Sequence, residues 1–135
     1  MKKMICTMVL AGCSLPLMLA AQSGNVTLPQ DKGSSKVDIS SYPPEQQKEY
    51  KVFADKCSKC HTLARPVNTT MTAPEWSRYV KRMMHKPNSG ISDNQGKAIY
   101  EFLAYDQENR KDKNPSAFSK ALSDEEIEKL KSEQH

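Results

Sequence analysis

The hydrophobic and polar positions of the chain predict helices and no convincing strand. Residues 44–56 carry apolar side chains at helical spacing, and Pro43 and Pro44 suit a helix start, so the first helix is expected there. Residues 65–70 combine Arg-Pro with an Asn-Thr-Thr run, which is typical of an irregular loop.

Two capping boxes mark the starts of later helices. In each, a Ser or Thr is followed three positions later by Glu or Gln, and each side chain bonds the backbone N–H of the other residue. The boxes begin at Thr72 and Ser92, and their helices are expected to end near Lys86 and Asp106. A short, heavily charged helix is predicted from Ser123. These elements predict a small all-α domain.

The first 21 residues have the layout of a secretory signal peptide. Lys2 and Lys3 give a positive start, and an uncharged, mostly apolar run continues to Ala21. We therefore expect cleavage near Ala21 and export to the periplasm. The alternative is a membrane-anchored lipoprotein, because Leu10-Ala11-Gly12-Cys13 resembles the lipobox in which the cysteine is lipidated.

The remaining chain divides into three parts. Residues 22–41 are rich in Gln, Ser, Gly, Asp and Lys, which predicts a flexible linker. Residues 42–106 hold the predicted helices and form the domain. Residues 107–135 are mostly polar and form a tail that ends in the short helix.

Composition narrows the function classes. A mean hydropathy of -0.72 excludes a polytopic membrane protein. The net charge of +4 over 135 residues is too mild to indicate nucleic-acid binding. Three Phe, one Trp and five Tyr are few for a self-sufficient core. If export removes Cys6 and Cys13, two closely spaced cysteines remain. A disulfide between them would close only a short loop and could not stabilise the domain.

Those two cysteines belong to Cys57-Ser58-Lys59-Cys60-His61, which is the attachment motif of c-type haem. Thiols one helical turn apart can both add to the haem vinyl groups, and the next histidine supplies an axial nitrogen. A thioredoxin-like pair would need a βαβ pattern. A zinc site would need two more ligands, and only His85 and His135 remain. We therefore expect one covalent haem c.

Beyond the motif, the chain resembles a known family. Phe53, the haem motif and a following helix that bears a methionine look like a class I-type monohaem cytochrome c. Trp76-x-x-x-Val80-x-Arg82-Met83, followed by Ile99-x-x-Phe102-Leu103, is similar to a bacterial subgroup. The resemblance covers about residues 44–106. It implies electron transfer between redox protein partners, with histidine and methionine as axial ligands.

Neighbouring residues compete to be the sixth iron ligand. On the helix that contains Trp76, Met83 lies at the centre of the apolar face, Met84 on its flank, and His85 on the opposite side. We expect Met83 to be the ligand and keep Met84 as its alternative. The further alternatives are His85, Met71 and an open iron position. Met83 would then be a core side chain that packs against the haem.

Other side chains have supporting roles in this hypothesis. Arg65 is a candidate hydrogen-bond donor to a haem propionate, with a solvated loop arginine as the alternative. Pro66 is a candidate to orient His61 through a neighbouring carbonyl. Trp76 and Tyr79 are expected to pack against the haem. A docking rim for an acidic partner is a further possibility, formed by Lys48, Lys51, Lys56 and Lys59.

The sequence thus predicts an exported electron carrier that performs no bond-making chemistry itself. Two alternatives remain: a haem-based sensor or enzyme with an open sixth iron position, and a redox subunit of a larger oxidoreductase complex. Because the side chains supply little apolar mass, we expect the domain to need its haem to hold its fold.

Overall fold

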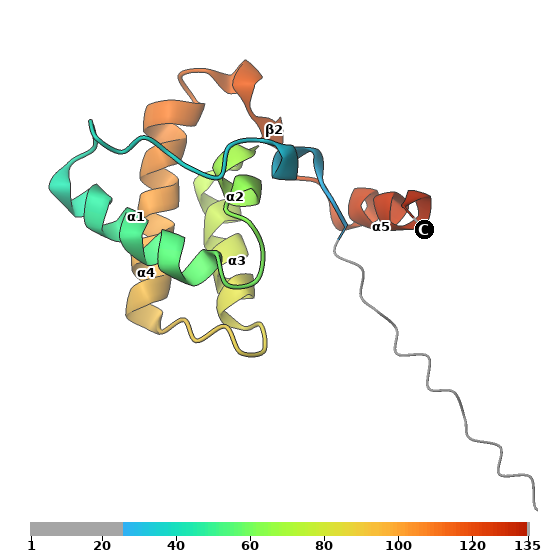
Figure 1. Cartoon of the computed structure of the whole chain (residues 1–135), viewed down its shortest axis with the longest axis horizontal. Coiled ribbons are helices and arrows are strands. Elements are labelled where there is room, and N and C mark those ends of the chain that lie inside the picture. The colour runs from blue at the N-terminus through green and yellow to red at the C-terminus, as the bar shows by residue number, and fades with distance from the viewer. Residues whose placement is uncertain (1–25, 135) are drawn as a thin grey trace, which may run out of the picture.

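The computed structural model describes residues 26–134, and the predicted signal peptide, Cys13 and His135 lie outside them. The described chain is mainly helical, which confirms the all-α prediction (Figure 1). One parallel pair of two-residue strands, β1 (Thr69–Thr70) and β2 (Ser119–Lys120), was not expected. The helices are α1 (Pro44–Cys57), α2 (Ala64–Asn68), α3 (Ala73–Met84), α4 (Asp93–Asp106) and α5 (Asp124–Glu133).

Both predicted capping boxes form. The backbone N–H of Thr72 donates to Glu75 Oε2 at 2.7 Å, and that of Ser92 donates to Gln95 Oε1 at 3.0 Å. A third box at Ser123 begins α5. These side chains satisfy N–H groups that have no partner inside a helix, and this is why the helix starts could be predicted from the sequence.

The predicted irregular loop was wrong in part, because residues 64–68 form α2. Pro66 lies in the first turn of this helix, where a missing N–H costs no hydrogen bond. Two side chains satisfy its carbonyls: Asn68 Nδ2 donates to Ala64 O at 2.7 Å, and Thr69 Oγ1 donates to Arg65 O at 2.6 Å. The same residues that are typical of loops therefore stabilise one short helix here.

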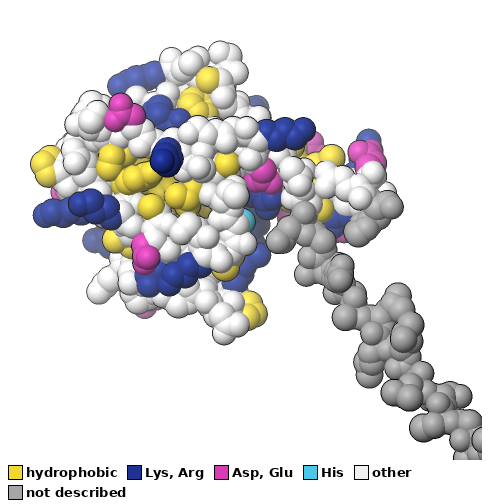
Figure 2. Space-filling model, in the orientation of Figure 1, with side chains coloured by type: hydrophobic (Ala, Val, Ile, Leu, Met, Phe, Trp, Pro, Cys, Tyr) yellow, Lys and Arg dark blue, Asp and Glu magenta, His cyan; other side chains and the backbone are white. Residues whose placement is uncertain are grey.

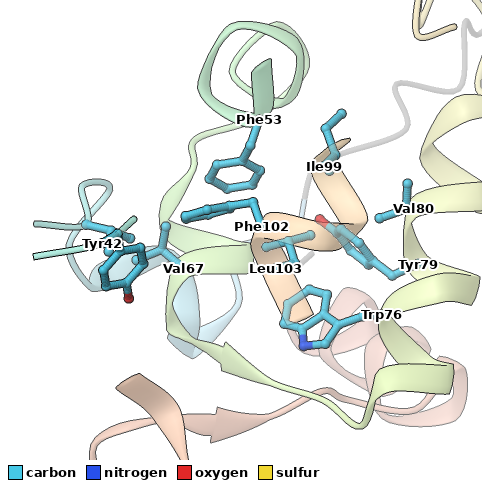
Figure 3. Close-up of a cluster of buried hydrophobic side chains, with 10 residues drawn as sticks. Tyr42, Phe53, Val67, Trp76, Tyr79, Val80, Ile99, Phe102 and Leu103 are labelled. Carbon is cyan, nitrogen blue, oxygen red and sulfur yellow. The ribbon is translucent and has the colours of Figure 1, made fainter. Parts of the chain in front are cut away.

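The core lies where α1 crosses α4. Phe53 and Phe102 are fully buried and stack with ring centroids 5.1 Å apart (Figure 3). Tyr50 packs on Phe102 at 5.1 Å. On the other side of α4, α3 contributes Trp76 and Tyr79, whose rings meet edge to face at 5.5 Å. A few aromatic side chains thus hold three helices together.

Part of the segment predicted as a flexible linker packs on the domain. Leu28 and Val37 are buried, and Gln30 Nε2 donates to Lys120 O at 2.9 Å. Single apolar residues in a polar run carry little periodic signal, but Val37 joins the hydrophobic core and Leu28 lines a cavity beside α2 and α3. The boundary between linker and domain at residue 41 remains a prediction.

The predicted polar tail also contributes to the structure. It begins with a π-helical turn, Gln107–Lys111, in which both end residues are buried. Gln107 Oε1 accepts hydrogen bonds from Trp76 Nε1 at 3.2 Å and from the Met71 N–H at 3.1 Å. By contrast, α5 has no buried residue. Within residues 26–134, no helix has both the length and the apolar character to cross a membrane.

Candidate functional site

The predicted attachment motif lies at the end of α1. Cys57 is the last residue of that helix, and Cys60 and His61 follow in the turn after it. Both cysteines are free thiols, with Cys57 half-buried and Cys60 exposed. Burial, and then the neighbouring Cys60, raises the pKa of the Cys57 thiol to about 12. Both sulfurs are therefore available for a covalent bond, and that of Cys57 is a neutral thiol.

The imidazole of His61 is oriented by its neighbour in the chain. Its Nδ1 lies 2.9 Å from the carbonyl oxygen of Thr62. A neutral ring that donates from Nδ1 keeps its lone pair on Nε2, where a metal ion can bind. The carbonyl that orients His61 is thus that of Thr62, four residues before Pro66, and the carbonyl of Pro66 accepts a hydrogen bond from Lys111 Nζ at 2.8 Å.

Two adjoining cavities lie beside His61, and we call them together the crevice. The larger has a volume of about 270 Å³ and the smaller about 30 Å³. Cys57 and Cys60 line the smaller one. Residues that line both are His61, Tyr79, Met83 and Lys86. The crevice therefore brings the attachment motif on one side to α3 on the other.

Met83 and Met84 point to different parts of the molecule. Met83 is half-buried and lines both cavities together with His61. Met84 packs on α4 instead, where its Sδ would lie only 2.3 Å from a Cβ added at Gly96. His85 is exposed, and its Nδ1 lies 2.6 Å from Lys81 O. Of these three candidates, the crevice contains Met83 alone.

Met71 also lines the larger cavity. Met71 lies just before α3, and its backbone N–H donates a hydrogen bond to Gln107 Oε1. Met71 therefore shares the larger cavity with His61 and Met83, whereas Met84 does not. As an alternative sixth ligand, Met71 fits the structure better than Met84 does.

Arg65 lines the larger cavity, but its guanidinium already has partners. Nε and Nη2 donate to the two carboxylate oxygens of Asp31 at 2.9 and 2.5 Å, and Nη2 also donates to Val26 O at 2.8 Å. Burial raises the pKa of Asp31, but the hydrogen bonds from Arg65 and the Leu28 N–H outweigh it and hold that pKa below its ordinary value. Arg82 and Lys86 are exposed cations on the same cavity.

The two aromatic residues expected beside a haem occupy different places. Tyr79 lines both cavities and is almost fully buried, and burial raises the pKa of its hydroxyl. Trp76 lies behind the crevice, with its ring 4.5 Å from Lys111 Nζ. The cavities of the crevice are lined by Tyr79 but not by Trp76.

The sequence analysis missed the contribution of the tail to the crevice. Leu122 and Ile127 line the larger cavity, and Asp124 at the start of α5 lies with them. The only signal was a pair of isolated apolar residues in a charged stretch, which resembles a solvated helix. Lys and Arg side chains are scattered over the visible face of the molecule (Figure 2). The docking rim at Lys48, Lys51, Lys56 and Lys59 stays a prediction.

The donor set fits haem c better than the other candidate chemistries. Two free thiols, the imidazole of His61 and the thioether of Met83 line the smaller cavity, and such a set can attach a haem covalently and bind its iron on both faces. In the part of the chain that the structure describes, no three His, Cys, Asp or Glu side chains gather around a metal position. The β-sheet that a thioredoxin-like site needs is reduced there to two-residue strands.

Comparison with known proteins agrees with this assignment. The family model described as Cytochrome c matches residues 46–132, which is more than half of the chain. No curated protein and no solved structure matches it. The family match implies covalently attached haem c, a role in electron transfer and redox proteins as partners. The chain belongs to the cytochrome c family.

Proposed function

We propose that this protein is an exported, class I-type monohaem cytochrome c that carries single electrons between redox partners. Cys57 and Cys60 hold the haem covalently, and His61 and Met83 bind its iron. The placement of His61 and Met83 on the same two cavities, with the two thiols at the edge, carries this proposal.

Each side chain has a definite task in this function. The bound haem supplies a one-electron couple. The carbonyl of Thr62 would hold the proton of His61 on Nδ1, which leaves Nε2 free to bind the iron. A thioether ligand favours the reduced state and so raises the reduction potential. The buried ring of Tyr79, which lines both cavities with His61 and Met83, would exclude water from this part of the site.

An electron carrier fits the crevice better than an enzyme does. A haem enzyme that activates peroxide needs an acid–base side chain beside the open iron position. Within residues 26–134, His61 is the only histidine that lines the crevice, and Asp124, its only carboxylate, is exposed on the tail helix. The sensor or enzyme alternative predicts a high-spin, open iron, and spectroscopy distinguishes the two directly.

The test is an absorption spectrum of the purified protein in both oxidation states. We expect a low-spin spectrum with the charge-transfer band of a methionine–iron bond, and Met83→Ala is expected to abolish that band. Met84→Ala is the matched control, because this neighbouring thioether packs on Gly96, and it is expected to keep the band. A band that survives in Met83→Ala and disappears in Met71→Ala would reassign the ligand. A high-spin spectrum that changes with carbon monoxide would favour the sensor.

Export is proposed from the sequence pattern of residues 1–21. The periplasm is also the compartment expected for covalent attachment of haem. Mass spectrometry of the mature N-terminus tests this part. A chain that begins near Gln22 supports a free periplasmic protein, and a chain that begins with lipidated Cys13 supports the membrane-anchored alternative.

A further inference from the structure

Lys111 is a fully buried cation that the proposed electron transfer does not yet use. Its side chain is 0% exposed, and Nζ donates to Pro66 O at 2.8 Å and to Thr69 O at 2.6 Å. The same nitrogen lies 4.5 Å from the centre of the Trp76 ring. Carbonyl oxygens and an aromatic face all favour an ammonium over a neutral amine. Lysine is almost never fully buried without such partners.

The ammonium lies directly behind one wall of the crevice. Pro66 and Thr69, whose carbonyls it binds, both line the larger cavity together with His61. Lys111 itself lines neither cavity. Its charge therefore acts on the crevice across a single layer of backbone, where little water is present to screen it.

The neighbouring charges do not cancel this ammonium. Asp106 is buried, and its Oδ2 lies 3.6 Å from Lys111 Nζ. However, Arg110 already pairs with both oxygens of that carboxylate at 2.6 Å, and the hydroxyl of Tyr42 donates to Oδ1 at 2.7 Å. One carboxylate thus faces two cations. Asp112 is the other acidic group near Lys111, and it is exposed and bonded to Gln107.

We propose that Lys111 sets the reduction potential of the haem site, its buried positive charge favouring the reduced state. The inference rests on the proposed function and adds a tuning residue to it. At an effective dielectric of about 20, one unit charge acting across a single layer of backbone changes a one-electron equilibrium by about tenfold. For one electron, a tenfold change corresponds to about 59 mV.

The same arrangement couples electron transfer to a proton. Burial lowers the pKa of Lys111 to about 8, with Arg110 acting in the same direction and Asp106 and Asp112 opposing it. Because binding of a proton favours the electron, binding of the electron must favour the proton to the same extent. Near this pH, Lys111 takes up a fraction of a proton from solvent for each electron that a redox donor delivers.

The experiment measures the reduction potential of the haem-bearing full chain and its variants. Lys111→Met, which keeps the length of the side chain and removes the charge, is expected to lower the reduced-to-oxidised ratio at a fixed potential by about tenfold. Asp106→Asn removes the opposing charge and is expected to shift the ratio in the other direction. Lys113→Met, an exposed lysine in the same segment, is the matched control and is expected to change nothing.

A second measurement needs no variant. The potential of the unmodified protein is expected to fall between about pH 7 and pH 9, and NMR of Lys111 should give a higher pKa in the reduced protein than in the oxidised one. An unchanged potential in Lys111→Met, or shifts of the same sign in Lys111→Met and Asp106→Asn, would overturn the inference while leaving the carrier function intact. An unmodified protein without a reversible one-electron couple would overturn both.

Discussion

The interface of α1 with α4 and the crevice beside His61 differ in what fills them. At the interface, Phe53 and Phe102 are fully buried and stacked. At the crevice, Cys60 is exposed, Met83 is half-buried, and a cavity of about 270 Å³ remains. The interface is close-packed by its own side chains, as protein interiors normally are. The crevice opens to solvent, and we expect the haem to fill it and so complete this half of the domain.

The largest expected effect comes from removing the haem. In the double variant Cys57→Ala/Cys60→Ala, covalent attachment is impossible, and we expect the domain not to hold its fold because the crevice half loses its filling. Amide hydrogen exchange should show any remaining protection confined to α1 and α4. A variant without haem that keeps full protection in α2 and α3 would mean that the crevice half is complete without it.

The next effect tests the interface itself. Phe102→Ala removes a fully buried ring that contacts Phe53, Tyr50 and Tyr42, and we expect the free energy of unfolding to fall by about 3–5 kcal/mol. Denaturant unfolding of the haem-bearing protein measures this. Leu63→Ala, at a half-buried position near the motif, is the contrasting variant and should cost clearly less. An equal fall in the free energy of unfolding for Phe102→Ala and Leu63→Ala would contradict the claim that side chains pack the α1–α4 interface more completely than the crevice.

A smaller effect depends on pH. Burial, and then the carboxylates of Glu101 and Glu45, raises the pKa of Glu49 from 4.5 to about 7. The folded state therefore holds this proton more tightly than the unfolded state. Its contribution to stability is complete below about pH 4.5, falls as the pH rises, and is lost above about pH 7.

Glu49→Gln removes this titration. We expect the variant to be more stable than the unmodified protein by about 1–2 kcal/mol at pH 8, with the difference disappearing toward pH 5. Urea unfolding across this range measures it, and Glu108→Gln, at an exposed position, is the control. A constant difference at all pH values would show that packing, and not the charge of Glu49, is responsible.

The smallest effect compares two capping boxes. Ser92 begins α4 in the core, and Ser123 begins α5, which has no buried residue. Ser92→Ala is expected to reduce the free energy of global unfolding by about 1 kcal/mol, as loss of a helix cap usually does. Ser123→Ala should leave global unfolding unchanged and increase only the amide exchange of α5. The reverse ranking would mean that α5 belongs to the cooperative unit.

Local signals made the helices predictable. The boxes at Thr72 and Ser92 depend on residues three positions apart, so one stretch of sequence contains the whole interaction. The haem motif at Cys57, Cys60 and His61 is local in the same sense, since five consecutive residues contain it. The separation of Met83 from Met84 also follows from helical geometry within a single turn.

Contacts between distant segments escaped prediction. Lys111 belongs to a charged stretch and would ordinarily be solvated, but carbonyls more than forty positions earlier bind it in the interior. Arg65 was expected to face a propionate, and its pairing with Asp31 depends on how residues 26–41 cross the domain. Such a contact joins single residues of two distant segments, so it leaves no periodic pattern in the sequence of either segment.

Mass spectrometry tests the central claim most directly. The chain, expressed with residues 1–21 in a host that attaches haem c, is purified and measured intact under denaturing conditions, and the peptide that contains Cys57 and Cys60 is then sequenced. We predict the mass of one haem on the mature chain, bound to both of these cysteines. A chain without haem, or with its haem attached at any other residue, would contradict the account.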